Sequence, residues 1–221
     1  MGSIRQAVIV MAKRPQAGQT KTRLCPPFTP EQAALLAEVF LRDTVTNLQR
    51  ADCAEVVLAY TPLEAEDWFA AQFPGLARIS QPDGDLGTRM NAVLEAAWRL
   101  RYQPCVLVGA DSPDLPAETL RAAFDALRPG PEGSDLVLGP AEDGGYYLLG
   151  LKGRQPSLFE SIAWSTEHVF AQTLERAHAL NLRVRQLPLW YDLDTPADLD
   201  RLRARLATAP PETCPATRRI I

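Results

Sequence analysis

Four cationic side chains are clustered in a loop near the amino terminus. Lys13, Arg14, Lys21 and Arg23 lie within eleven residues. Gly18, between them, would let a ligand approach the backbone closely. Lysine and arginine form charge-assisted hydrogen bonds to phosphate oxygens, so the loop is a candidate phosphate site. The run AKRPQAGQTKTRL lacks the first glycine of a Walker A loop. A solvated basic surface loop is the alternative, and the residues alone favour neither.

A carboxylate follows a short uncharged apolar run later in the chain. Asp111 follows the run that ends at Val108, after Gly109 and Ala110. An acidic residue leaving a buried strand is well placed to hold Mg²⁺ or Mn²⁺, which take oxygen ligands and bridge to substrate phosphates. Asp111 and Lys21 are therefore the candidate catalytic residues. Ser112 or Asp114 would cap the helix that follows, and this structural role is compatible with a metal ligand at Asp111.

Two further carboxylates lie in the segment YDLDTPADL. Thr195 and Pro196 together form a strong signal for a helix start, with Asp198 as the capping partner three residues on. That capping explains Thr195 and Asp198 without any function. It leaves Asp192 and Asp194 unexplained, again after an expected strand, and we treat both as candidate metal ligands.

Two glycine-containing turns are weaker candidates. In EDGGYY, Gly144 and Gly145 would let a ligand approach the backbone, and Asp143 or Tyr146 would bond sugar hydroxyls. A plain hairpin turn explains the same residues equally well.

The second turn, QPDGDLGTRM, combines Gln81, Gly84 and Gly87 with Arg89 at a helix start. This turn would cradle a nucleobase. A loop with no binding role is the simpler explanation of the same residues.

The elements that position these residues alternate along the chain. Strands are expected at 7–11, 55–60, 77–80, 105–108, 136–139, 145–151 and 183–187, and helices at 31–50, 63–73, 88–100, 117–127, 166–180 and 196–206. Such alternation predicts one α/β domain, residues 1–207, with a mostly parallel twisted sheet and helices on both faces. Ligands of such sheets bind at the carboxyl ends of the strands. The loops there begin at Ala12, Gln81, Gly109, Pro140 and Leu189. Residues 208–221 carry prolines and no periodicity, which predicts a flexible tail.

Composition excludes several classes of function. The net charge of −4 argues against a nucleic-acid partner, which would call for a basic face. The four cysteines form no C-x-x-C pair, and the two histidines belong to no H-E-x-x-H motif, which argues against a zinc site. No G-x-S-x-G elbow or G-x-G-x-x-G fingerprint is present. No apolar run approaches the length of a signal-peptide core or a membrane span, so we expect a cytoplasmic protein.

Taken together, the sequence blocks resemble a known family. AKRPQAGQTKTRL, QPDGDLGTRM, GADSPDLP, GPAEDGGYYLLGL, the segment WST and DLDTPADL occur in this order over nearly the whole chain. They resemble a bacterial family of unknown function, DUF2064, whose members are often labelled glycosyltransferases of the arsenosugar-biosynthesis type. This family looks like part of the nucleotide-diphospho-sugar transferase superfamily, which has the GT-A-like fold. The K-x-R-L and D-x-D-T-P-x-D-L features are also similar to those of lactyl-phosphate guanylyltransferases.

The resemblance implies roles for the candidate residues. The nucleotide would be bound by Ala12, Lys13, Arg14, Gly18, Lys21 and Arg23 in the basic loop and by Gln81, Gly84, Gly87 and Arg89 in the second turn. Asp111 would be the first ligand of Mg²⁺ or Mn²⁺, with Asp192 or Asp194 as the second. Asp143, Gly144, Gly145 and Tyr146 would face the second substrate.

Three functions remain open at this point. The first is a metal-dependent transferase that uses a nucleotide-activated sugar and a small-molecule acceptor. The second is a nucleotidyltransferase that releases pyrophosphate, which the four cations of the basic loop favour because a triphosphate carries more charge than a diphosphate. The third is a non-catalytic nucleotide sensor. The sequence leaves the oligomeric state open, a homodimer included.

Overall fold

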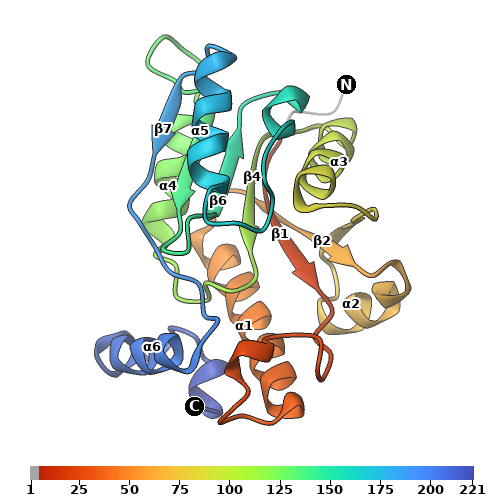
Figure 1. Ribbon diagram of the computed structural model, residues 1–221, viewed down its shortest axis with the longest axis vertical. Helices are drawn as coiled ribbons and strands as arrows, with labels where there is room; N and C mark the ends of the chain where they lie inside the picture. The colour runs from red at the N-terminus through yellow and green to blue at the C-terminus, as the bar shows by residue number, and fades with distance from the viewer. Residues whose placement is uncertain (1–4) are drawn as a thin grey trace.

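The computed structural model describes residues 5–221, which form a seven-stranded sheet with helices on both faces (Figure 1). The strands are β1 (Arg5–Lys13), β2 (Glu55–Thr61), β3 (Ala77–Ser80), β4 (Tyr102–Gly109), β5 (Leu136–Pro140), β6 (Tyr146–Leu151) and β7 (Val184–Gln186). They lie in the order β3-β2-β1-β4-β6-β5-β7. Only β6 runs antiparallel to its neighbours among the described strands. The expected single-domain, mostly parallel α/β sheet is confirmed.

Six α-helices and four short 3₁₀ turns connect the described strands. The helices are α1 (Pro30–Ala51), α2 (Glu66–Gln72), α3 (Leu86–Arg99), α4 (Ala117–Ala126), α5 (Val169–Ala179) and α6 (Pro196–Thr208). The 3₁₀ turns are η1 (Thr22–Leu24), η2 (Leu63–Ala65), η3 (Pro156–Phe159) and η4 (Thr217–Arg219). None of these helices is both long and apolar enough to cross a membrane.

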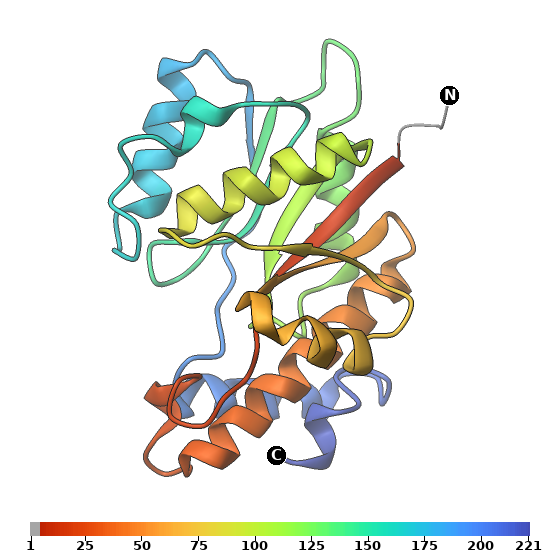
Figure 2. The ribbon, with the colours of Figure 1, turned by 90° about the vertical axis from the view of Figure 1, so that its right-hand side faces the viewer.

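Alternate residues of the central strand β1 face two separate cores. Val8 and Val10 pack in a cluster with residues of α1, α2 and α4, whereas Ile9 packs in a cluster with residues of α3 and α5. Successive side chains of a strand point to opposite faces, so an uninterrupted apolar run fits a strand covered on both sides. Figure 2 shows helices on the two sides of the sheet.

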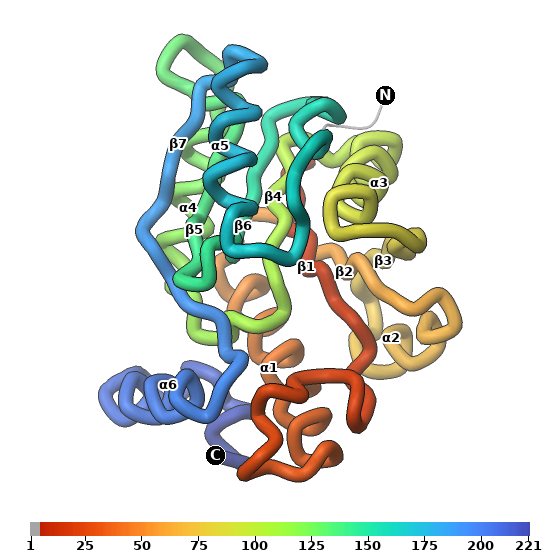
Figure 3. Tube along the Cα trace, in the orientation of Figure 1, coloured from red at the N-terminus to blue at the C-terminus, as the bar shows by residue number. Residues whose placement is uncertain are grey.

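A third cluster lies beyond the carboxyl end of β1. It joins the loop after β1, through Leu24, to Phe40 of α1, Leu193 before α6 and Leu202 within α6. Figure 3 follows the chain from β7 to α6 and shows α6 beside the loop that follows β1. This cluster therefore packs together the segments that carry the expected basic and acidic residues.

Two of the helix starts were predicted by their capping signals, and one was not. Capping boxes begin α1 at Thr29 and α6 at Thr195, as the Thr-Pro pairs predict. Helix α5 begins at Val169, three residues later than expected. Thr166 Oγ1 donates to the carbonyl of Ala163 and accepts from the backbone N–H of His168. A hydroxyl that bonds nearby backbone in this way competes with helix formation.

Residues 208–221 pack against α1, although the sequence predicts a flexible tail. Asp43 of α1 is buried, and its carboxylate accepts the backbone N–H groups of Ala216 at 3.0 Å and Thr217 at 2.7 Å. Arg218 donates to carbonyl oxygens of the chain between 206 and 213. The anchor is a residue of α1 far away in sequence, which is why composition of the tail alone did not reveal it.

Candidate active site

The candidate site lies at the carboxyl ends of β1 and β4. Chain connections leave these two adjacent strands toward different parts of the sheet, which is the position where open α/β sheets bind ligands. The loop after β1 brings Lys21, and the loop after β4 brings Asp111. The segment before α6 brings Asp192 and Asp194 to the same edge.

The two acidic segments are joined by direct hydrogen bonds. The backbone N–H of Leu193 donates to the carbonyl of Asp111 at 3.1 Å, and Ser112 Oγ donates to Asp192 Oδ1 at 3.1 Å. Asp194 is fixed from the other side, because its backbone N–H donates to the carboxylate of Asp198 at 3.2 Å. The segment that carries Asp192 and Asp194 is therefore held by hydrogen bonds to the loop after β4 on one side and to Asp198 on the other.

Asp114, two residues beyond Ser112, has a structural role. Its Oδ2 accepts from the hydroxyl of Tyr191 at 2.8 Å and from Arg205 Nε at 2.7 Å. The side chain of Asp114 is only 3% exposed. It joins the loop after β4 to α6 and contributes to the shape of the site without facing it.

Lys21 is buried between two carboxylates, and its expected role in binding phosphate stays a prediction. Its Nζ lies 2.7 Å from Asp194 Oδ1 and 2.9 Å from Asp111 Oδ2, and its side chain is 5% exposed. Burial alone would lower the pKa of this ammonium, but the two carboxylates outweigh burial and leave the pKa raised. Its backbone is in the left-handed region, with φ of 52°. Lys21 is thus a charged bridge between two of the expected metal ligands.

Asp192 is crowded by other acids. Burial, followed by the nearby charge of Asp111, raises its pKa to about 6, with Asp143 adding to the effect. The hydrogen bond from Ser112 and the charge of Lys21 act in the opposite direction. The raised pKa of Asp192 therefore reflects burial first and the neighbouring carboxylates second.

The residues at this edge fit a hard divalent cation in their chemistry. Carboxylate oxygens are the ligands that Mg²⁺ and Mn²⁺ prefer, and Asp111 lies close enough to Asp192 for its charge to add to the raised pKa of Asp192. Within residues 5–221, however, no three His, Cys, Asp or Glu side chains are gathered closely enough to hold a metal ion. The ligand set is present, but Lys21 stands between two of its members.

The other residues of the basic loop differ in how they are held. Lys13 is exposed, and the guanidinium of Arg14 lies 5.9 Å from the ring centre of Trp68. Arg23 is 74% exposed and lies 3.7 Å from Asp194 Oδ2. Gly18 has φ of +72° in an exposed turn, a conformation that favours glycine. Three cations of this loop thus have exposed or half-exposed side chains, and Arg23 is the one among them with a measured contact to a site carboxylate.

The second turn contains residues with structural roles of their own. Gln81 Nε2 donates to the carbonyls of Ala12 at 3.2 Å and Ala59 at 2.6 Å, which ties the ends of β1 and β2 together. A Cβ on Gly87 would lie 2.4 Å from the ring of Trp164, so this glycine permits a close contact. Gly84 adopts a φ of +129°. Arg89 is half-buried at the start of α3. Their role in binding a base stays a prediction.

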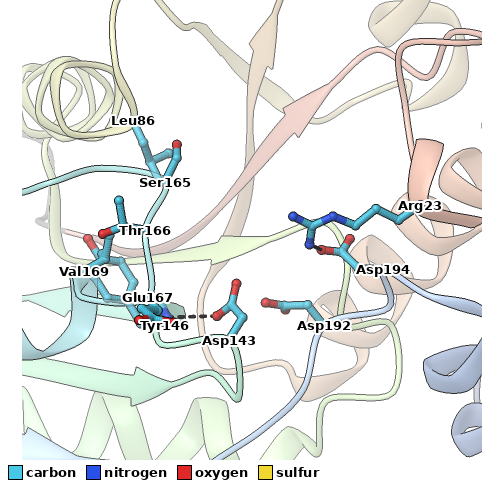
Figure 4. Close-up of a pocket in the computed structure, with 11 residues that line it drawn as sticks. Arg23, Leu86, Asp143, Tyr146, Ser165, Thr166, Glu167, Val169, Asp192 and Asp194 are labelled. Atoms are coloured by element: carbon cyan, nitrogen blue, oxygen red, sulfur yellow. Dashed lines mark hydrogen bonds and ion pairs between the residues drawn. The ribbon is translucent and has the colours of Figure 1, made fainter.

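A cavity of about 540 Å³ opens beside the carboxylates (Figure 4). Its lining residues come from the loop after β1, the start of α3, the β5–β6 turn, the loop before α5 and the segment before α6. They are Arg23, Leu86, Asp143, Gly145, Tyr146, Ser165, Thr166, Glu167, Val169, Asp192 and Asp194. Figure 4 shows the carboxylates of Asp143 and Asp192 facing each other, with Arg23 extended toward Asp194.

The β5–β6 turn contributes to the cavity in part as expected. Asp143 and Gly145 line it, and Asp143 Oδ1 accepts the backbone N–H of Gly145 at 2.8 Å. Gly144 instead packs against the loop before α5, where an added Cβ would lie 2.1 Å from the carbonyl oxygen of Glu167. The hydroxyl of Tyr146 lies 3.8 Å from Met90 Sδ, and burial raises its pKa. That hydroxyl points into the core, so among the side chains of this turn Asp143 is the one placed to hydrogen-bond a ligand in the cavity.

Sequence reasoning missed most of one wall of the cavity. Ser165, Thr166 and Glu167 lie in the loop before α5, although the sequence predicts that a helix begins at Thr166. The signal was present in the paired hydroxyls of Ser165 and Thr166, since such residues favour loops and caps over helix interiors. Leu86 was missed because α3 begins two residues earlier than its apolar spacing suggested.

Comparison with known proteins places the chain in a family. The model of the family described as "Uncharacterized protein conserved in bacteria (DUF2064)" matches residues 44–166. The chain belongs to the DUF2064 family. The matched region of this DUF2064 protein includes α3, β4, Asp111 and the β5–β6 turn, although the basic loop and the segment before α6 lie outside it.

Individual relatives of this DUF2064 protein are named as transferases. A phosphoenolpyruvate guanylyltransferase from Sphaerobacter thermophilus is 27% identical over 183 residues, which cover 82% of this chain and 86% of the relative. A crystal structure from Desulfovibrio desulfuricans G20, described as a candidate nucleotide-diphospho-sugar transferase, is 32% identical with a TM-score of 0.88 and covers 96% of this chain and 92% of that one. A cytidylyltransferase from Leptospira borgpetersenii shares the fold, with 15% identity, a TM-score of 0.61 and coverage of 96% and 90%.

Proposed function

We propose that this DUF2064 protein is a metal-dependent transferase that acts on a nucleotide-activated sugar. The observation that carries the proposal is the arrangement at one sheet edge: a carboxylate cluster lies between a cationic loop and a polar cavity. Asp111, Asp192 and Asp194 form the cluster, and the cavity lies directly against the last two. In such an arrangement the cationic loop would bind the diphosphate, and the cavity on the other side of the carboxylates would bind the sugar.

The basic loop is suited to the phosphates of the donor. Arg14 and Lys13 leave the carboxyl end of β1, and Arg23 reaches the rim of the cavity. Their charges would hold the diphosphate through charge-assisted hydrogen bonds. A divalent ion held by Asp111 with Asp192 or Asp194 supplies, when bound, stabilisation of the negative charge that develops on the leaving diphosphate.

The cavity is suited to a hydroxyl-bearing group. Its volume of about 540 Å³ falls in the range of small-molecule sites. Asp143, Ser165 and Thr166 offer hydrogen-bonding groups at its surface, and Leu86 and Val169 offer apolar contacts. Among the described lining residues Arg23 is the single cation against four carboxylates, Asp143, Glu167, Asp192 and Asp194. This balance favours an uncharged sugar over a phosphorylated second substrate.

Nucleotidyl transfer is the second candidate. It is favoured by the guanylyltransferase relative, whose alignment spans most of both chains. In this reaction the basic loop would bind a nucleoside triphosphate, an acceptor phosphate would attack the α-phosphorus in line, and pyrophosphate would leave. The same three loop cations and the same carboxylates would serve it.

The products decide between the candidates. The protein is incubated with nucleoside triphosphates and with nucleoside-diphosphate sugars, each with Mg²⁺ or Mn²⁺, and the products are separated by ion-exchange chromatography. We expect release of a nucleoside diphosphate or monophosphate from a sugar donor, and loss of this release in Asp111→Asn. Release of pyrophosphate from a triphosphate establishes nucleotidyl transfer instead.

A thermal-shift screen with the same ligands identifies the donor. A ligand at about 100 times its Kd stabilises the fold by roughly 2.7 kcal/mol, which is readily measured. Nucleotide binding with no turnover of any substrate would contradict the enzymatic proposal and establish a nucleotide sensor.

A further inference from the structure

Lys21 lies where a cation shared by Asp111 and Asp194 would lie. Its ammonium is 2.9 Å from Asp111 Oδ2 and 2.7 Å from Asp194 Oδ1, and almost none of the side chain reaches solvent. Asp192 is held differently, since its Oδ1 accepts from Ser112 Oγ. The pair of oxygens that face one another across a cation are therefore those of Asp111 and Asp194, and the cation is part of the chain itself.

The ammonium and a divalent ion exclude each other from this position. Mg²⁺ binds oxygen at about 2.0–2.1 Å and demands near-octahedral geometry, which leaves no room for Nζ between the same two oxygens. Two positive charges a few ångströms apart also repel strongly in a partly buried site. Among residues 5–221 no three His, Cys, Asp or Glu side chains are gathered closely enough to hold a metal ion, and Lys21 Nζ occupies the space between Asp111 and Asp194.

Lys21 belongs to the same loop as the candidate phosphate-binding cations. It precedes the short turn η1 in a loop whose other cations, Lys13, Arg14 and Arg23, are exposed or half-exposed. A lysine side chain has a long flexible stem, so its ammonium can be redirected without refolding the loop. Phosphates bound by this loop would offer oxygens that replace those of the two aspartates.

We propose that Lys21 is an exchangeable internal cation. In the metal-free protein it neutralises Asp111 and Asp194, and when Mg²⁺ or Mn²⁺ binds these carboxylates it turns to the phosphates of the nucleotide. The inference rests on the proposed function for the identity of its second partner, but its first half concerns the metal alone. It predicts that metal and nucleotide assist each other beyond the direct bridge between them, because the metal releases a phosphate-binding group.

The first test measures the reactivity of Lys21 in the wild-type protein. The chain has three lysines, Lys13, Lys21 and Lys152, so reductive methylation followed by peptide mass spectrometry can follow each one. Without metal we expect Lys21 to react several-fold more slowly than exposed Lys13. Addition of Mg²⁺ should raise the rate at Lys21 several-fold and leave Lys13 and Lys152 unchanged. Further addition of a nucleoside diphosphate should protect Lys21 again.

The second test measures Mn²⁺ binding by electron paramagnetic resonance in Lys21→Met. Removal of a competing charge should tighten Mn²⁺ binding roughly tenfold or more, the scale expected for a unit charge a few ångströms away. Lys152→Met is the matched control, because Lys152 follows β6 at the opposite end of the sheet. In Lys21→Met the enhancement of nucleoside-diphosphate affinity by Mn²⁺ should be smaller than in wild type, although Mn²⁺ itself binds more tightly.

These outcomes separate the inference from the proposed function. Equal Lys21 reactivity with and without Mg²⁺, or unchanged or weaker Mn²⁺ binding in Lys21→Met, would overturn the exchange. If the metal responses appear but no nucleotide protects Lys21, the cation exchange at the aspartates stands, and the nucleotide half of the inference fails together with the proposed function. The wild-type reactivity test applies even if Lys21→Met does not fold.

Discussion

Asp111 and Asp114 are close in sequence but serve the molecule in different ways. Asp114 is buried against Tyr191 and Arg205, and Asp111 has a side chain that is 44% exposed and pairs with Lys21. The same chemical group therefore supports the fold at one position and is available to a ligand at the other.

Replacement of each aspartate by asparagine should separate these roles. Asp114→Asn should lower the free energy of unfolding by about 1 to 3 kcal/mol, the scale for hydrogen bonds to a charged group, because Arg205 loses its partner. Asp111→Asn should change it by less than about 1 kcal/mol, since lost attraction to Lys21 is offset by lost repulsion from Asp192. Urea unfolding and Mn²⁺-dependent nucleotide binding measure the two effects. An Asp111→Asn protein that binds nucleotide normally with Mn²⁺ would remove Asp111 from the mechanism.

Whether the environment of a residue could be predicted depends on how far away in the sequence its contact partners lie. Asp111 was predicted from its place just after β4, whereas Asp192 and Asp194 lie six and eight residues beyond the end of β7 and reach this edge through the segment before α6. The burial of Lys21 was not predicted, because one of its partners lies 173 residues away in the chain. The inward direction of the Tyr146 hydroxyl depends on Met90, which no local pattern relates to the β5–β6 turn.

At the scale of elements, the start of α3 and the loop before α5 form one wall of the cavity. Gly87 in the first turn of α3 lies against the ring of Trp164, which directly precedes Ser165 and Thr166. The contact between Gly87 and the Trp164 ring sets how closely the loop before α5 approaches α3. The position of the hydroxyls at the cavity therefore depends on the absence of a side chain at residue 87.

A methyl group at this contact should displace the wall. In Gly87→Ala the Cβ would lie 2.4 Å from the Trp164 ring, so the loop must move, with a loss of stability of about 1 to 3 kcal/mol for overpacking. We expect weaker binding of a nucleoside-diphosphate sugar and nearly unchanged binding of the free nucleoside diphosphate, both measured by calorimetry. Gly153→Ala is the control, because its added Cβ makes only an ordinary contact. Equal weakening of both ligands would place the wall in the nucleotide site instead.

Element boundaries show which local signals are sufficient. The starts of α1 and α6 were predicted because Thr29 and Thr195 cap them through their own side chains. The antiparallel direction of β6 was not specified by its apolar residues, since a buried strand reads the same in both directions. It follows from the short β5–β6 turn, which only an antiparallel pair can use.

At the scale of the whole molecule, the last residues of the chain hold the carboxyl edge of the sheet together. The cluster that contains Leu24, Leu193 and Leu202 also contains Cys214 and receives Ile221 at its border. Asp43 anchors this segment through two backbone N–H groups. The tail thus covers the same apolar cluster that supports the basic loop and the acidic segment.

Loss of the anchor should affect the site as well as the tail. Asp43→Ala leaves two backbone N–H groups without their acceptor, at a cost of about 2 kcal/mol or more in unfolding free energy. We expect faster proteolysis between residues 208 and 221 and a lower melting temperature. Asp67→Ala, at an exposed position in the first turn of α2, is the control. A tail that stays resistant to protease in Asp43→Ala would show that the apolar contacts alone retain it.

The tail and the candidate site pack on the same apolar cluster, and this determines which part of the protein unfolds first on heating. The two cores that flank the sheet are separate clusters from the one beneath the carboxyl edge. A cluster held by the end of the chain opens more readily than the centre of a sheet, because local opening requires less than global unfolding. We expect ligand binding to be lost several degrees below the transition seen by far-ultraviolet circular dichroism. Coincident curves would mean that the carboxyl edge and the rest of the sheet melt as one unit.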